Sequence, residues 1–255
     1  MTMADTPPPY LRGTVTAAEQ AEIEAMLGPI NHDGALRAVR DGRGRQFQRL
    51  EFVGDSVLDV ILAVHAWTEP RCTGCAGPEV TNPASDSRLA EVASRAGLGS
   101  WLEWRASAER IADLVETCIA ACWLSGGWPQ AARFVAGLVH PVSAATVQAL
   151  VSGMAGLEAG RVGRRAGSAL LELAAGDSVT DAYPEADEGE LSTRRASVHR
   201  ATAIAMIAKE RGLAVRGEPE VVLSVVEDQV ATVLAAQGAD AALLLAKQFV
   251  PVAPQ

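Results

Sequence analysis

The sequence predicts an all-α protein. Apolar residues recur at helical spacing along most of the chain, and no stretch of useful length alternates between apolar and polar residues as a half-buried strand would. Of the 255 residues, 49% are apolar and only 4% are aromatic, a composition that suits helices packed around a sizeable core. The length is sufficient for one large domain or for two domains of the common size.

The expected helices follow one another between Gly and Pro residues, which interrupt the helical spacing. In the first half of the chain they are residues 17–27, 34–41, 50–67, 86–97, 108–125 and 129–138. In the second half they are residues 144–156, 166–180, 188–211, 220–236 and 238–248. A boundary between the halves is expected near residues 139–142.

Residues 1–15 are expected to form a disordered lead, because they contain three consecutive prolines and lack the basic and apolar segments of a secretory signal. No apolar run is long enough to form a membrane-spanning helix. We therefore expect a cytoplasmic protein that does not enter a membrane.

Two pairs of acidic residues stand out, because each lies in an otherwise apolar segment. Glu51 and Asp55 are four residues apart, and Asp113 and Glu116 are three apart, so each pair lies on one face of its helix. Acidic pairs at this spacing are usually solvated. A solvated face would normally carry basic partners one turn away, and here only Arg110 qualifies. Four carboxylates from two buried helix faces would make an all-oxygen site suited to Mg²⁺.

Both acidic segments resemble motifs of the ribonuclease III family. Residues 49–58, Arg-Leu-Glu-Phe-Val-Gly-Asp-Ser-Val-Leu, resemble the family signature, and residues 112–116, Ala-Asp-Leu-Val-Glu, resemble its second acidic motif. Residues 87–93 and 97–99, between the two, resemble a family helix and the Gly-Leu-Gly turn after it. The order and spacing of these pieces agree with the family.

The resemblance implies a metal-dependent endoribonuclease that hydrolyses phosphodiester bonds in double-stranded or structured RNA. It implies Mg²⁺ as the cofactor, with Mn²⁺ as a possible substitute, because one metal-bound water can attack the phosphodiester. The residues that would bind the metal and carry the catalysis are Glu51, Asp55, Asp113 and Glu116.

The second half of the chain resembles the same family. Residues 167–174 are similar to a stretch of its first motif, and residues 183–192, Tyr-Pro-Glu-Ala-Asp-Glu-Gly-Glu-Leu-Ser, match a further family segment nearly letter for letter. The resemblance therefore implies two tandem ribonuclease III-like domains, residues 16–141 and 144–250, packed as an intramolecular pseudodimer. We expect no counterpart here of the double-stranded-RNA-binding domain that is usual in the family.

The second domain is expected to be degenerate. Arg164 and Ser168 stand at the positions of the first acidic pair. The second acidic motif can be aligned in two registers. One register keeps Glu227 and the other keeps Asp228, so in either case only one of the four metal-binding acids of the first domain has an acidic counterpart. An arginine in place of a ligand would repel a divalent cation, so this domain is expected not to hold the metal.

The first domain lacks a different acid of the family, the Glu of its Asp-Glu-Gly segment. Gly77 stands at that position, whereas the second domain keeps Glu188. Family enzymes are symmetric dimers in which this acid serves the partner's site. The resemblance thus implies one composite site, with Glu188 as an auxiliary acid from the second domain, and cleavage of one strand. The alternative is that Glu188 is a solvated turn residue.

The net charge of −9 is unusual for a protein that binds RNA and argues against strong, indiscriminate RNA binding. Arginines nevertheless gather before and within the first motif, and the planar guanidinium suits phosphate oxygens. Our candidates for RNA binding are Arg40, Arg43, Arg45 and Arg49. Ordinary solvated arginines remain the alternative.

Two other interpretations stay open. The chain could be a catalytically inactive protein that binds RNA or a ribonucleoprotein, or two chains could pair as a homodimer.

Four cysteines could hold Zn²⁺, although two of them lie in an apolar segment where small core residues are expected. They are Cys72, Cys75, Cys118 and Cys122.

Overall fold

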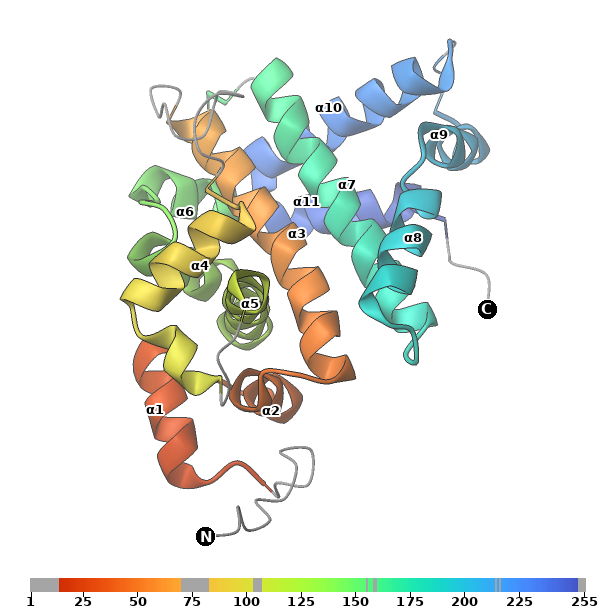
Figure 1. Ribbon diagram of the computed structural model, residues 1–255. Helices are drawn as coiled ribbons and strands as arrows, with labels where there is room; N and C mark the ends of the chain where they lie inside the picture. Colours follow the sequence, from red (N-terminus) through yellow and green to blue (C-terminus); the bar gives the residue numbers. More distant parts are fainter. Residues whose placement is uncertain are drawn as a thin grey trace, which may run out of the picture.

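The protein is described by a computed structural model that covers residues 14–69, 83–102, 107–154, 156–157, 160–213, 215 and 217–251. Every regular element in these residues is a helix, and this confirms the all-α class (Figure 1). Most of the expected N-terminal lead lies outside the described residues, as do Cys72, Cys75 and Gly77.

The first half of the chain contributes five α-helices, and α5 is followed by a short connection, residues 139–143. The helices are α1 (Ala17–Leu27), α2 (Asp33–Asp41), α3 (Arg45–Thr68), α4 (Asp86–Arg95) and α5 (Ala108–Leu138). A 3₁₀ helix, η2, spans Leu98–Trp101. Within α5 the backbone leaves the helical region at Gly126 and Gly127, which is where the two expected helices meet.

The second half contributes six more helices within the described residues. They are α6 (Ala144–Ser152), α7 (Arg161–Ala182), α8 (Glu188–Val198), α9 (Ala201–Glu210), α10 (Pro219–Gln237) and α11 (Ala239–Phe249). The single helix expected over residues 188–211 is wrong, because the extended backbone of Arg200 separates α8 from α9. No Gly or Pro marks this break in the sequence.

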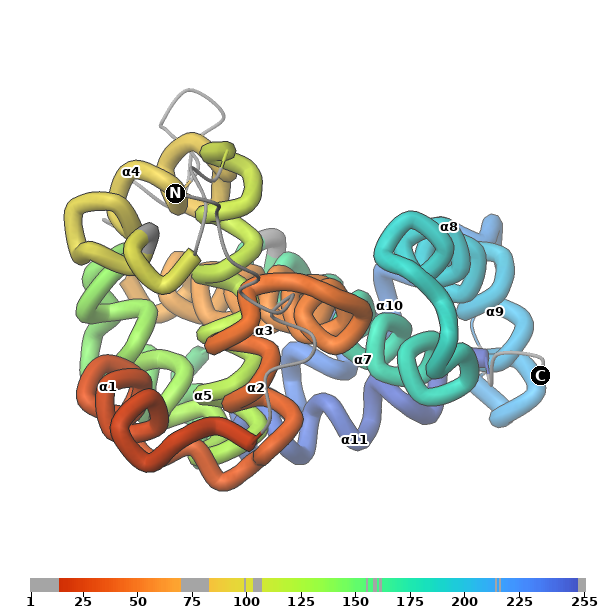
Figure 2. The backbone as a smooth tube through the Cα atoms, turned by 60° about the horizontal axis from the view of Figure 1, so that its bottom comes forward, coloured from red at the N-terminus to blue at the C-terminus, as the bar shows by residue number. Residues whose placement is uncertain are grey.

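Helix α3 lies at the centre of the molecule and packs on α5 and on α7. Helix α7 packs in turn on α10 and α11. Figure 2 shows α1, α2, α4 and α5 on one side and α8 and α9 on the other, with α3 and α7 side by side between them. Large, fully buried side chains, such as Ile61 on α3 and Leu170 on α7, form one continuous core.

Two glycines allow unusually close helix packing. A Cβ atom on Gly54 of α3 would lie 1.9 Å from the carbonyl oxygen of Glu116 on α5, and one on Gly167 of α7 would lie 2.2 Å from the carbonyl oxygen of Glu227 on α10. Any larger residue would force these helices apart. The same contact thus occurs once in each half, and it favours the register in which Glu227 corresponds to Glu116.

Polar contacts also join the halves. His65 Nδ1 lies 3.0 Å from Thr146 Oγ1, and Trp128 Nε1 donates to Asp240 Oδ1 at 2.8 Å. Both His65 and Trp128 are buried, so these hydrogen bonds satisfy polar atoms that burial would otherwise leave without water. Among the helices that the structure describes, none combines the length and the apolar character needed to cross a membrane.

Candidate metal site

Three carboxylates from two helices converge beside the Gly54 contact. Glu51 comes from α3, and Asp113 and Glu116 come from α5. Each offers an oxygen atom, and these atoms all lie within 4.8 Å of one another. The close approach of α3 and α5 therefore brings together three of the four acids that the motifs predict.

The surroundings of these carboxylates oppose their ionisation. Burial, followed by repulsion from Asp55, Glu51 and Asp113, raises the pKa of Glu116 to about 9. Burial and repulsion from Asp113 raise the pKa of Glu51 to about 8, and burial raises the pKa of Asp113 to about 6. Near neutral pH the three carboxyl groups cannot all be ionised unless a cation neutralises their charge, and without a cation some of them keep a proton. A set of carboxylate oxygens with this property fits a hard divalent cation such as Mg²⁺ or Mn²⁺.

Asp55 lies beside this group and not within it. Its Oδ2 atom is 3.7 Å from Nη1 of Arg195 on α8, and its side chain is 41% exposed. Burial raises the pKa of Asp55, while the charge of Arg195 opposes that rise. The fourth predicted acid is thus engaged by an arginine from the other half of the chain.

Glu188 approaches the group from the second half. It is the first residue of α8, and the N-cap Asp187 accepts a hydrogen bond from the backbone N–H of Glu190 at 2.9 Å, which shapes this turn. The charge of Glu188 contributes to the raised pKa of both Glu51 and Asp113. Its carboxylate therefore lies close enough to act on the group electrostatically.

The four candidate RNA-binding arginines differ in their surroundings. Arg40 pairs with the neighbouring Asp41, and the Nε and Nη2 atoms of Arg43 are buried. Arg45 pairs with Glu185, and Arg49 donates from Nη2 to the carbonyl oxygen of Thr180 at 2.8 Å. Arg45 and Arg49 thus tie α3 to the end of α7 and to the turn that follows it, a role that the sequence did not suggest. RNA binding by these arginines stays a prediction.

Arg110 is a further part of the site. Its guanidinium donates from Nη2 to the carbonyl oxygen of Gly42 at 2.6 Å and lies over the ring of Phe47. From this position its positive charge lowers the pKa of Glu51 and Asp113. It partly offsets the repulsion among the three carboxylates.

The corresponding place in the second half holds an ion pair. Arg164 donates from Nε and Nη2 to the two carboxylate oxygens of Asp228, each at 3.1 Å. Ser168 hydrogen-bonds Glu227, and burial raises the pKa of Glu227. A guanidinium thus supplies the positive charge that a cation would supply in the first half.

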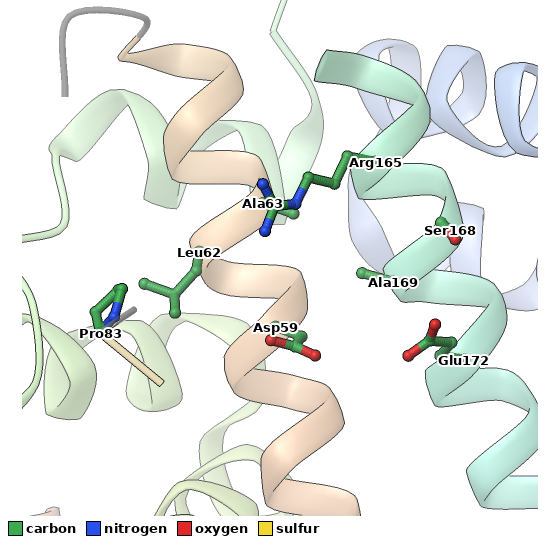
Figure 3. Close-up of a pocket in the computed structure, with 8 residues that line it drawn as sticks. All are labelled: Asp59, Leu62, Ala63, Pro83, Arg165, Ser168, Ala169 and Glu172. Atoms are coloured by element: carbon green, nitrogen blue, oxygen red, sulfur yellow. The ribbon is translucent and has the colours of Figure 1, made fainter. Parts of the chain in front are cut away.

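A separate pocket lies between α3 and α7, and Figure 3 shows Asp59 and Glu172 facing each other across it. Arg165 and Ser168 complete its polar lining. Burial, with repulsion from Asp55 and Glu172, raises the pKa of Asp59 to about 7. Asp59 follows Asp55 by one helical turn, so the row of acids on α3 continues beyond the candidate metal site.

The cysteines that the structure describes, Cys118 and Cys122, are free thiols buried in the core. Because Cys72 and Cys75 lie outside the described residues, the zinc hypothesis stays a prediction.

Curated ribonuclease 3 proteins are similar to part of this chain. The ribonuclease 3 of Rhizobium etli is 30% identical over 146 residues, which cover 48% of this chain and 59% of that protein. The ribonuclease 3 of Heliobacterium modesticaldum is 36% identical over 121 residues, 42% of this chain and 49% of that protein. The ribonuclease 3 of Rhizobium meliloti is 32% identical over 127 residues, 45% of this chain and 51% of that protein. The chain thus spans about half the length of the curated relatives it matches. No family model matches it.

Proposed function

We propose that this chain, which is related to the ribonuclease III family over about half of its length, is a metal-dependent endoribonuclease with a single active site in its first half. Its substrate would be double-stranded or structured RNA. The observation that carries the proposal is the convergence of Glu51, Asp113 and Glu116 within 4.8 Å, on the two helices that contain the family-like motifs.

Glu51, Asp113 and Glu116 would hold Mg²⁺ or Mn²⁺. A bound cation of this kind supplies a water of lowered pKa and a charge that stabilises negative charge on the phosphate oxygens. The chain's own part is to fix the three carboxylates on two rigid helices before RNA binds, so that little reorganisation is needed. Asp55 offers a hydrogen-bond acceptor beside them, and Glu188 adds a carboxylate from the second half.

We further propose that residues 16–141 and 144–250 are two domains that form a pseudodimer. The matching Gly54 and Gly167 contacts support this, as does the packing of α3 on α7. The Arg164–Asp228 ion pair supports the loss of the metal from the second domain. A protein with one live site would cut one strand of a duplex at a time.

The test uses two matched variants and an end-labelled RNA duplex in Mg²⁺. Glu116→Gln removes a carboxylate of the proposed site, and Glu227→Gln makes the same change at the corresponding position of the second half. We expect cleavage to be lost in Glu116→Gln, by about a thousandfold or more, and kept in Glu227→Gln. Equal activity of the two variants would contradict the proposal.

A second function has its own support. The net charge of −9 argues against strong, indiscriminate RNA binding, and two of the candidate RNA-binding arginines, Arg45 and Arg49, are engaged by Glu185 and by the carbonyl oxygen of Thr180. This favours a catalytically inactive protein that binds RNA or a ribonucleoprotein. RNA binding by the unmodified protein without any cleavage, in Mg²⁺ and in Mn²⁺, would support this alternative.

A further inference from the structure

Arg195 belongs to α8 of the second half, but its guanidinium reaches α3 of the first half. Its Nη1 atom donates to Ser56 Oγ at 2.9 Å and lies 3.7 Å from Asp55 Oδ2. The guanidinium also lies over the ring of Phe52, 4.5 Å from the ring centroid. Three partners within two turns of α3 hold the guanidinium in one orientation, and only 22% of the side chain is exposed.

The position of Arg195 matters because Asp55 is close to the three clustered carboxylates. After burial, the charge of Asp55 does most to raise the pKa of Glu116, yet Asp55 itself is not part of the cluster. An unpaired Asp55 would add a fourth negative charge at the edge of a group that already opposes ionisation. Arg195 places a positive charge on the side of Asp55 that faces α8.

We propose that Arg195 is a positioning residue, which holds Asp55 as a separate carboxylate beside Glu51, Asp113 and Glu116 and keeps it out of their group. Asp55 then remains a hydrogen-bond acceptor for a water or an RNA hydroxyl at the site. Through this contact the second half sets the geometry of an acid in the first half, in addition to contributing Glu188. The inference rests on the proposed nuclease function.

The kinetic test compares Arg195→Gln, Arg195→Lys, Asp55→Asn and the double variant Asp55→Asn/Arg195→Gln on one RNA duplex. Arg195→Gln should lower kcat about tenfold or more while KM for RNA changes less than about twofold, because substrate binding does not depend on this contact. In the Asp55→Asn background, Arg195→Gln should lower kcat by less than about twofold, since the two residues act as a unit. Arg195→Lys should recover part of kcat, because an ammonium can still pair with Asp55.

The matched control is Arg194→Gln. Arg194 precedes Arg195 on the same helix, but its guanidinium lies over the ring of Tyr183, 3.7 Å from the centroid. This variant removes the same charge from α8 and should keep kcat within about twofold of the unmodified protein.

A second readout does not depend on catalysis. Mn²⁺ binding, followed by electron paramagnetic resonance, should tighten by about threefold or more in Arg195→Gln, because a positive charge near the site is removed, and should weaken in Asp55→Asn. If Arg195 were only a structural brace, Arg195→Gln would lower the melting temperature and weaken Mn²⁺ binding together. If Arg195 instead contacted an RNA phosphate, Arg195→Gln would raise KM at constant kcat. Either of these results overturns the proposal.

The measurements also separate this inference from the proposed function. If the unmodified protein binds Mn²⁺ and cuts RNA while Arg195→Gln behaves like Arg194→Gln, only the role of Arg195 is wrong. If the unmodified protein neither binds Mn²⁺ nor cuts RNA, both proposals are overturned.

Discussion

At the scale of single residues, Glu116 shows how burial and charge create a demand for a cation. It is 8% exposed, and its pKa is raised to about 9 by burial and by the neighbouring acids. The folded protein therefore binds a proton at Glu116 more tightly than the unfolded chain does. The pKa of Glu51, raised to about 8, acts in the same direction.

We accordingly expect the metal-free protein to lose stability as the pH rises from about 4.5, where these carboxyls ionise in the unfolded chain, to about 9, where Glu116 has ionised in the folded protein as well. Mg²⁺ should remove most of this loss, because the cation neutralises the carboxylates in place of the protons. Melting temperatures measured against pH, in EDTA and in Mg²⁺, provide the check. Glu116→Gln should flatten the EDTA curve, and a wild-type EDTA curve that is already flat would speak against a buried acidic group.

At the scale of the helices, the contact of Gly54 with the backbone of Glu116 brings α3 onto α5. Gly54→Ala places a methyl carbon 1.9 Å from the carbonyl oxygen of Glu116, so we expect a loss of about 3 kcal/mol in the free energy of unfolding. Mn²⁺ binding should weaken as well, because Glu51 moves with α3. Gly137→Ala on α5 is the control. A Cβ built there has no atom within 4 Å other than those of its chain neighbours and its own helix backbone, so this change should be neutral or slightly stabilising. Urea unfolding of the two variants distinguishes a tight helix contact from a general sensitivity to alanine.

The end of α7 depends on α3 in a different way. Arg49 donates to the carbonyl oxygen of Thr180 in the last turn of α7, close before Glu188. Arg49→Gln should reduce the free energy of unfolding by about 1–2 kcal/mol, since a charged donor and a favourable charge at the helix C-terminus are lost. Arg45→Gln breaks only the exposed pair with Glu185 and should change stability by less than about 0.5 kcal/mol. If Arg45→Gln instead proves the more destabilising change in thermal unfolding, the exposed pair contributes more to stability than the contact of Arg49 with Thr180.

At the scale of the whole molecule, the proposed single active site predicts asymmetric cleavage. We expect a monomer of about 26.6 kDa by light scattering, and nicks in one strand of a duplex per encounter. Native and denaturing gels of the same reaction separate nicking from double-strand cleavage. Paired, offset cuts by a protein that stays monomeric would contradict the single site, and a dimeric mass in the active fraction would favour pairing between chains.

Local spacing in the sequence was sufficient for the helical class and for most helix bounds, because the apolar period and the Gly and Pro residues act over a few positions. It failed at Arg200, where the chain bends without either residue. It also identified Glu51, Asp113 and Glu116 as acids on apolar faces, because a charge among apolar neighbours is visible from spacing and flanks.

The partners of these acids depend on contacts between segments that are far apart in the chain. Arg195 meets Asp55 across 140 positions of sequence, and Arg49 reaches Thr180 across 131. No local period encodes such pairs, because they follow from the way α3 packs on α7 and α8. Packing also left Asp55 outside the carboxylate group and placed an arginine–aspartate pair in the second half. Helix periodicity is a property of neighbouring residues, whereas the charge balance of a buried site is a property of every segment that surrounds it.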